Sequence, residues 1–378
     1  EIFYAWEGID AGPEIPLGQQ QSSSAIFRTY APSSTTNRYF PRLITILSNG
    51  TYNAEILPEY TRDVTLRLVA RDNRPDGGGV GWADVAMKAW GEAGPFLVTS
   101  PNTASATWNI GEYVNVTWDV ANTYFAPVNC KRVNIRLSTD GGLTYPITLA
   151  SGVENNGNYY VLVPNNVTSA ARVRVDAADN VFFDISNANF KIQQPTQPSL
   201  TMGLSVNAAD ICLPSDGFTS EILTAGTLGF DSPVALAITG DLPPGASASF
   251  SSPTLNPGET STLTVDLNGV TLEGVYTFNV EATATGSPTL VRTVTVRLVS
   301  NDFSALALQS PIDGATGLGL SQVLRWNVVP DAETYDVQFS NTPSFSTLLS
   351  SATSTSVDSF KINFLLEKGK AYYWRVRP

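Results

Sequence analysis

The sequence predicts an all-β protein: tandem antiparallel β-sandwich modules that follow one another as an elongated rod. Three observations support this fold class. Short segments alternate between apolar and polar residues, turn signals rich in Gly, Pro and Asn recur between them, and no window of 12 residues has a convincing helical pattern. Many short strands at such spacing are typical of sandwiches, in which each sheet has one buried and one wet face.

The alternating segments recur along much of the chain. Val133, Ile135 and Leu137 share one face of a predicted strand, while the residues between them are polar. Turn signals such as "PDGGG", "NNGN", "LPPGA" and "NPGE" separate segments of this kind. The same period of two predicts further strands at 171–177, 261–267, 292–299 and 333–339.

Breaks in this pattern divide the chain into four modules. A Pro- and Gln-rich linker at 193–199 is the clearest of these breaks. Modules of about 100 residues match the size of immunoglobulin-like domains. We expect the first and last modules to be incomplete, which makes the chain a fragment cut at both ends. The predicted modules span residues 1–93, 94–193, 199–300 and 304–378.

Composition excludes several classes of function. The 378 residues include no histidine, which removes Ser-His-Asp and Cys-His catalysis and every H-E-x-x-H zinc site. The net charge of −12 argues against nucleic acid or an anionic membrane surface as partner, and no run of about 18 apolar residues predicts a membrane span. Cys130 and Cys212 fall in different modules, so we expect two separate thiols.

The stretch "STDGGLTYP", residues 138–146, is close to the Asp-box motif S-x-D-x-G-x-T-W known from sialidases. It occurs once, with Tyr145 in place of Trp. Asp140 can accept bonds from backbone N–H groups two residues on, and Gly141 and Gly142 can adopt positive φ. We therefore interpret the motif as a hairpin turn, with Thr144 and Tyr145 beginning the next strand.

Two clusters of oxygen-bearing side chains are candidates for calcium. Ca²⁺ takes six to eight oxygen ligands, and weak extracellular sites are common. The spacing differs from the EF-hand order, and a hairpin with solvated acids explains the same residues. The stronger candidates are Asp72, Asn73, Asp76 and Asp84, and a second, weaker cluster is Asp176, Asp179, Asn180 and Asp184.

A glycosidase needs at least one pair of carboxyl side chains. Glu7 with Asp10, or Glu55 with Glu59, are pairs that could be proposed. Nothing in the sequence places either pair about 5 to 10 Å apart in a cleft. We interpret these residues as surface acids.

The tryptophans divide into core and surface candidates. Trp118 and Trp326 alternate in phase with core residues and resemble the buried Trp of a sandwich strand. Trp6, Trp82 and Trp90 are less clearly in phase. The turn-like "TWNIGEY" makes Trp108 the best candidate for a surface contact.

These motifs resemble one family. Residues 95–192, with "VNVTWDVANT" and "RVNIRLSTDGGLTYPITLASG", resemble an immunoglobulin-like module of large secreted proteins of Bacteroidetes-type bacteria. In many of these the module lies downstream of a reprolysin-like zinc metallopeptidase domain. The flanking segments are similar too, and "SPIDGATGLGLSQVLRWNVV" looks like a fibronectin type III module. The family's H-E-x-x-H helix and C-terminal sorting domain are not in this sequence, so no catalytic residue carries over.

The resemblance implies a non-catalytic stalk that spaces or docks a secreted or surface-attached bacterial protein, whose parent is a metallopeptidase. The expected partners are an extracellular protein or polysaccharide surface and the rest of a longer parent chain. An adhesin or surface-filament subunit without a peptidase is the alternative, and an upstream H-E-x-x-H motif distinguishes the two. A glycosidase without histidine would need two buried carboxylates with shifted pKa values in a cleft.

Overall fold

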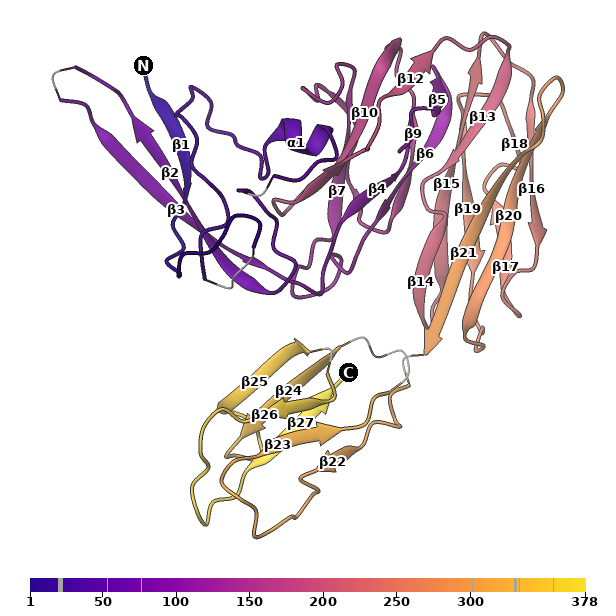
Figure 1. Cartoon of the computed structure of the whole chain (residues 1–378). Helices are drawn as coiled ribbons and strands as arrows, with labels where there is room; N and C mark the ends of the chain where they lie inside the picture. The colour runs from indigo at the N-terminus through magenta and orange to yellow at the C-terminus, as the bar shows by residue number, and fades with distance from the viewer. Residues whose placement is uncertain are drawn as a thin grey trace.

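The computed structural model describes residues 1–19, 23–52, 54–75, 77–300, 302–329, 332, 334–355 and 357–378. It is all-β, with strands β1 to β27 and one five-residue helix among the described residues, which confirms the predicted fold class. Each sheet lies within one of the four predicted segments, which we call modules 1 to 4 (Figure 1). The described residues contain no helix long and apolar enough to span a membrane.

Module 1 differs from the predicted sandwich. Strands β1 (Phe3–Gly8), β2 (Arg62–Arg71) and β3 (Val80–Ala89) form one antiparallel sheet in the order β1-β2-β3. The described residues between β1 and β2 carry helix α1 (Leu43–Leu47) and otherwise pack as irregular chain. This segment supplies few apolar residues at a period of two, so the described residues of module 1 form no second sheet to oppose the first.

Module 2 is a sandwich of a three-stranded sheet, β4-β6-β9, and a larger sheet of order β5-β12-β10-β7-β8 with β11 paired to β10. Alternating side chains from both sheets fill its core, including Trp118, Ile135 and Val173. Its strands are β4 (Leu97–Ser100), β5 (Thr107–Asn109), β6 (Tyr113–Asp119), β7 (Arg132–Ser138), β8 (Ile147–Glu154), β9 (Asn158–Leu162), β10 (Thr168–Ala177), β11 (Phe183–Ile185) and β12 (Phe190–Gln193).

Module 3 is the most regular sandwich. Its sheets have the orders β13-β15-β19-β17 and β14-β21-β20-β16-β18, and long strands such as β20 and β21 pair over nine residues. The strands are β13 (Ser199–Leu204), β14 (Ala208–Leu213), β15 (Gly217–Thr227), β16 (Val234–Gly240), β17 (Ser247–Phe250), β18 (Thr254–Leu255), β19 (Thr260–Asp266), β20 (Gly274–Ala284) and β21 (Leu290–Ser300).

Module 4 packs two three-stranded sheets, β22-β23-β26 and β25-β24-β27, around Trp326 and Tyr335. Its strands are β22 (Leu308–Ser310), β23 (Val323–Trp326), β24 (Tyr335–Ser340), β25 (Leu348–Thr355), β26 (Ser359–Lys361) and β27 (Tyr373–Arg377). Figure 1 shows modules 1 to 3 side by side and module 4 turned back beneath them, so the outline is bent and differs from the elongated rod predicted.

The tryptophan predictions have mixed outcomes. Trp118 and Trp326 are buried, at 3% and 0% exposed, which confirms their core roles. The prediction for Trp108 is wrong: it is 6% exposed and its ring centroid lies 4.6 Å from that of Phe190. The reason is that β5 pairs in parallel with β12, which directs Trp108 into the core of module 2.

The two cysteines are free thiols, as predicted. Cys130 is buried and Cys212 is exposed. Burial raises the pKa of the Cys130 thiol to about 12, so this side chain stays protonated at neutral pH.

Candidate functional site

The Asp-box stretch is a turn, as predicted, but its details differ. Asp140 Oδ1 accepts hydrogen bonds from the backbone N–H groups of Leu143 and Thr144, three and four residues on, both at 3.0 Å. Gly141 and Gly142 have φ of 82° and 95°, a region that glycine enters without strain. The next strand, β8, begins at Ile147, so the prediction that Thr144 and Tyr145 open it is wrong.

Both oxygens of the Asp140 carboxylate accept hydrogen bonds within this turn. The carboxylate also accepts hydrogen bonds from the hydroxyls of Ser138 and Thr144, both at 2.6 Å. These hydrogen bonds, that of Ser138 first, lower the pKa of Asp140 to about 2. A carboxylate held in this way stabilises a turn and has no proton to give at neutral pH.

The turn also lies at the junction of modules 1 and 2. A Cβ atom on Gly142 would come within 2.4 Å of the Leu47 side chain in α1, and the φ of 95° also favours glycine, so a larger residue there would displace Leu47 and strain the backbone. Arg172 donates a hydrogen bond to the carbonyl oxygen of Leu47 at 3.3 Å, and Arg174 donates one to the hydroxyl of Tyr39 at 3.2 Å. The motif that first suggests chemistry therefore belongs to an interface between modules.

The calcium candidates are held by other partners. Asp84 forms a bidentate pair with Arg67, at 2.6 and 2.8 Å, and this pairing lowers its pKa. Asp72 accepts a hydrogen bond from the backbone N–H of Gly79 within its own hairpin. Asp76 lies outside the described residues, and Asn73 adopts a φ of 46° in the same hairpin. Calcium here stays a prediction.

The second cluster is also divided among protein partners. Asp176 pairs with Arg136 and Arg174, each at 3.1 Å. Asp184 accepts a hydrogen bond from the backbone N–H of Val98 at 2.7 Å, and burial raises its pKa. Across the described ranges, no group of three or more Asp, Glu, Cys or His side chains could hold a metal ion.

The proposed carboxylate pairs have separate structural partners. The side chain of Glu55 is fully buried and forms an ion pair with Arg38, so its interpretation as a surface acid is wrong. Asp10 pairs with the fully buried Arg62 at 3.0 Å. Both acids are therefore neutralised by arginines inside module 1.

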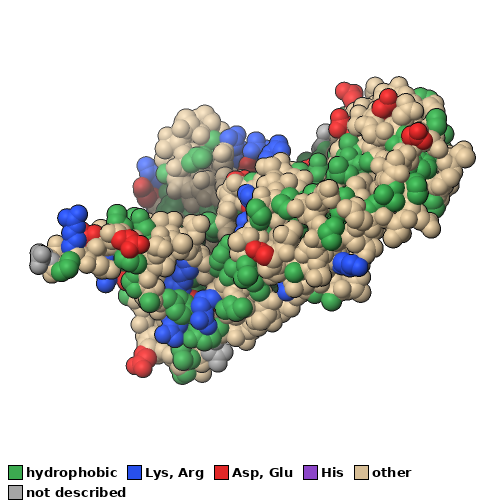
Figure 2. Space-filling model, turned by 90° about the horizontal axis from the view of Figure 1, so that it is seen from above, with side chains coloured by type: hydrophobic (Ala, Val, Ile, Leu, Met, Phe, Trp, Pro, Cys, Tyr) green, Lys and Arg blue, Asp and Glu red, His purple; other side chains and the backbone are tan. Residues whose placement is uncertain are grey.

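Sequence reasoning missed a concentration of arginine and tyrosine in module 1. The guanidinium carbons of Arg28, Arg38 and Arg42 lie 5.3, 4.7 and 5.1 Å from the ring centroid of Tyr30. Arg42 also lies 4.8 Å from the ring centroid of Tyr52. We call these five residues the arginine–tyrosine cluster. Figure 2 shows Lys and Arg side chains gathered over the part of the surface that belongs to the N-terminal module.

Arg38 forms the rigid base of this cluster. Its guanidinium pairs with Glu55 and donates hydrogen bonds to the backbone oxygens of Trp6 and Arg28, at 2.8 and 2.7 Å. The Glu55 carboxylate also accepts a hydrogen bond from the backbone N–H of Arg42 at 3.1 Å. Because Arg38 cross-links β1 to the loop segments, it fixes the positions of its neighbours.

A cavity of about 220 Å³ lies beside the cluster. The backbone of Ser33 pairs with that of Tyr4, with hydrogen bonds of 2.7 and 2.9 Å, which closes one wall against β1. The lining combines aromatic rings, two arginines and small polar groups: Tyr4, Ala5, Trp6, Tyr30, Ala31, Ser33, Thr35, Asn37, Arg38, Tyr39 and Arg42.

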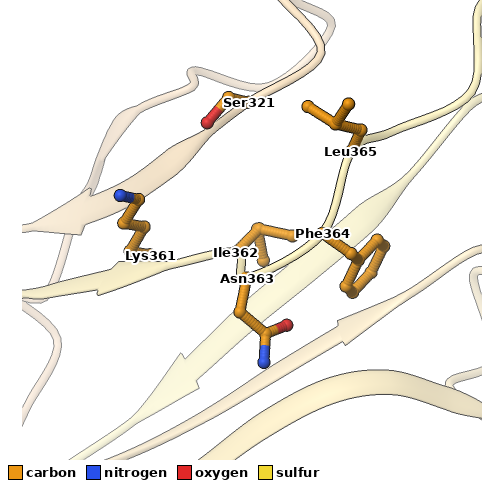
Figure 3. Close-up of a pocket in the computed structure, with 6 residues that line it drawn as sticks. All are labelled: Ser321, Lys361, Ile362, Asn363, Phe364 and Leu365. Atoms are coloured by element: carbon orange, nitrogen blue, oxygen red, sulfur yellow. The ribbon is translucent and has the colours of Figure 1, made fainter.

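A second cavity, of about 560 Å³, lies in module 4. Figure 3 shows its lining side chains spread around the end of β26, with Ser321, Lys361 and Leu365 on different sides. Lys361 is the one ionisable side chain in that lining, and Leu365 is 73% exposed. The module 4 cavity thus lacks the convergent polar groups that orient a ligand.

Comparisons with known proteins give no family. No family model matches the chain, and no curated protein matches it. Among solved structures, fibronectin(III)-like modules of CbhA from Clostridium thermocellum are 9% identical, covering 55% of this chain and 95% of that one, with a TM-score of 0.19. Immunoglobulin domains 1–4 of Sidekick-1 are 10% identical, covering 89% and 76%, with a TM-score of 0.29.

Domains 4 and 5 of the S-layer protein SbsC are 16% identical, covering 55% of this chain and 99% of that one, with a TM-score of 0.21. Scores this low support no inference about function. The assignment of tandem β-sandwich modules therefore rests on the strand pairing and the cores described above.

Proposed function

We propose that this chain is a non-catalytic stalk and interaction region of a large secreted or cell-surface bacterial protein, and that its parent is a zinc metallopeptidase. The parent is suggested by the family resemblance of residues 95–192 and their flanks. The stalk role is supported by the positions of the polar side chains described above. They stabilise turns, sheets and module junctions. A chain without histidine also lacks the commonest general base.

The observation that carries the stalk role is the bonding between successive modules. At the junction of modules 1 and 2, Asn49 donates a hydrogen bond to the carbonyl oxygen of Asn187 at 2.8 Å. The rings of Tyr39 and Phe183 pack edge to face, with 5.4 Å between their centroids. These contacts add to those of Arg172 and Arg174 with module 1. A junction bonded in this way holds two modules at a set angle.

The junction of modules 2 and 3 is built similarly. The backbone N–H of Tyr113 donates to the hydroxyl of Thr201 at 2.7 Å, and the Arg292 guanidinium lies 5.4 Å from the ring centroid of Tyr160. Gly203 allows close approach there, because a Cβ atom would lie 3.0 Å from the Tyr160 side chain and 3.2 Å from the Tyr113 ring. Both junctions thus transmit orientation along the chain, as a spacer requires.

X-ray scattering by the isolated chain tests the stalk role. A double variant, Tyr39→Phe with Asn49→Ala, removes two hydrogen bonds across the first junction, so we expect a larger radius of gyration and a broader distance distribution. The control is Asn363→Ala with Tyr373→Phe, which makes the same chemical changes at exposed positions of module 4. Equal scattering by the two variants would contradict an orienting role for the junction.

Two further measurements test the remaining parts of the proposal. The isolated chain should show no turnover of peptide or glycoside substrates, and any turnover lost on replacement of a single carboxylate would overturn the non-catalytic role. The open reading frame of the parent should encode an H-E-x-x-H motif upstream. A frame without this motif would favour the second candidate, an adhesin or surface-filament subunit, which the polar cavity of module 1 also suits.

A further inference from the structure

The arginine–tyrosine cluster has more positive charge than its own fold requires. Three guanidiniums surround Tyr30, and Glu55 is the one carboxylate that pairs with them among the described residues, which leaves a net charge of +2. This excess lies in a chain whose overall charge is −12. Holding like charges together costs free energy, so a local excess of this kind is a mark of an anion-binding site.

Arg42 is the guanidinium available to a ligand. It lines the cavity and is exposed, and in the described part of the chain its side chain makes no hydrogen bond or ion pair. Stacking over Tyr30 and Tyr52 holds the guanidinium in place and leaves its N–H donors unused. A guanidinium positioned in this way can bind a carboxylate with two parallel hydrogen bonds.

Arg38 completes the positive wall. Its side chain is 12% exposed, and its Nε–H is buried without a hydrogen-bond acceptor among the described residues. Arg28 adds a third positive charge and donates a hydrogen bond to the hydroxyl of Tyr52 at 2.9 Å, and no acid among the residues that the structure describes pairs with it. The anionic group of a ligand would therefore lie close to Arg42, against a wall that Arg38 keeps rigid.

The rest of the lining fits a hydroxylated ring. Tyr4, Trp6 and Tyr39 contribute aromatic residues to the lining, and Ser33, Thr35 and Asn37 contribute residues with hydroxyl and amide groups. A volume of about 220 Å³ is below the roughly 300 to 1,000 Å³ of sites for drug-sized ligands, so the cavity suits a single ring. Aromatic rings with small polar groups suit the apolar face and hydroxyls of a sugar.

We propose that this cavity binds a uronic acid unit of an acidic polysaccharide, with its carboxylate on Arg42 and its ring against the aromatic wall. This inference deepens the proposed interaction role and rests on it, because it names the kind of extracellular surface that module 1 contacts. Because the sugar would approach through attraction of opposite charges, its affinity falls as ionic strength rises.

Calorimetry and NMR titration of the full chain test this proposal with D-glucuronate and short oligogalacturonates as probes. A single ring should bind with a Kd on the order of 1 mM. Arg42→Gln should weaken binding at least roughly 10-fold, because a charge-assisted hydrogen bond to the carboxylate is lost. The control is Arg71→Gln, which removes the same charge from an exposed position of the same module that is outside the cavity lining, and should leave the Kd unchanged.

Several outcomes would overturn the proposal. Equal binding of glucose and glucuronate would exclude recognition of the carboxylate. Tighter binding of a Glu-containing peptide would replace the polysaccharide by an acidic protein as partner. If the chain does not bind uronate but its scattering matches the bonded junctions, the uronate site is excluded and the stalk role stands. If the junctions prove loose but uronate still binds, the uronate site stands and the stalk role is excluded.

Discussion

Module 3 buries eighteen hydrophobic side chains in one core, whereas the core of module 1 has four among the described residues: Ile26, Phe27, Val64 and Leu66. Module 1 instead uses buried ion pairs. The side chains of Arg62 and Glu55 are fully buried, and each pairs with an oppositely charged residue from a distant part of the module. One module is held by apolar burial between two sheets, the other by arginines that cross-link irregular chain to one sheet.

This difference carries over to function. A sandwich core uses its side chains for packing, so the wet faces of module 3 are free to vary without changing the fold. Irregular chain can instead enclose a cavity and place several arginines around it, which regular strands of period two do less readily. The module with the smaller core is therefore the one that has the candidate binding site.

The largest expected effect tests the ion pairs of module 1. Glu55→Gln leaves the buried guanidinium of Arg38 without its counter-charge, so we expect module 1 to lose about 3 to 5 kcal/mol of stability. Hydrogen exchange followed by mass spectrometry, which resolves the four modules, measures this loss. Glu14→Gln at an exposed position serves as the control, and equal protection of module 1 in the two variants would show that apolar burial alone holds it.

The matching test in module 3 removes apolar volume. Leu263, on β19, is 0% exposed, and Leu263→Ala should destabilise module 3 by about 3 kcal/mol through lost burial and a residual cavity. Thr264→Ala, on the exposed face of the same strand, should cost less than about 1 kcal/mol. Denaturant unfolding checks both values, and a Leu263 effect no greater than that of Thr264 would mean that the core is loosely packed.

A third test concerns module 2, in which a buried polar side chain is hydrogen-bonded beside the apolar core. Asn155 is 0% exposed, accepts a hydrogen bond from the indole N–H of Trp118 at 2.8 Å, and donates to Thr123 and to the backbone of Cys130, both at 3.0 Å. Asn155→Ala leaves these buried groups unsatisfied, and we expect a loss of about 2 kcal/mol.

Hydrogen exchange of module 2, followed by mass spectrometry at increasing urea concentration, reports the effect of Asn155→Ala. The exposed Asn166 provides the control when changed to alanine. A loss below about 0.5 kcal/mol at Asn155 would show that other groups, such as water, replace the amide at little cost.

The contrast between regular strands and irregular chain explains how far the sequence predicts the structure. Alternation identifies the strands around Ile135, Leu263 and Val337, because their period of two directly reflects which face is buried. It does not identify the cluster around Tyr30, since Arg28, Arg38 and Arg42 come together through irregular chain that has no period. Trp108 is misread for a related reason: a three-residue strand is too short to show its phase.

The smallest expected effect concerns the exposed turn at Asp140. Asp140→Asn keeps the shape of the side chain but weakens its hydrogen bonds, and we expect a cost of about 1 kcal/mol at neutral pH because solvent screens the turn. The folded pKa of about 2 lies below the ordinary value of 3.8, so the carboxylate stabilises the fold above about pH 4. This contribution is lost as the pH falls from about 4 towards 2.

The stability difference between the unsubstituted chain and Asp140→Asn should therefore shrink over that interval. Urea unfolding midpoints at successive pH values measure this difference. Asp241→Asn, at an exposed loop position after β16, should show no comparable trend. A constant difference down to pH 2 would mean that the hydrogen bonds of the turn do not depend on the charge of Asp140. In that case the junction with α1, rather than the carboxylate, would be what holds the turn in place.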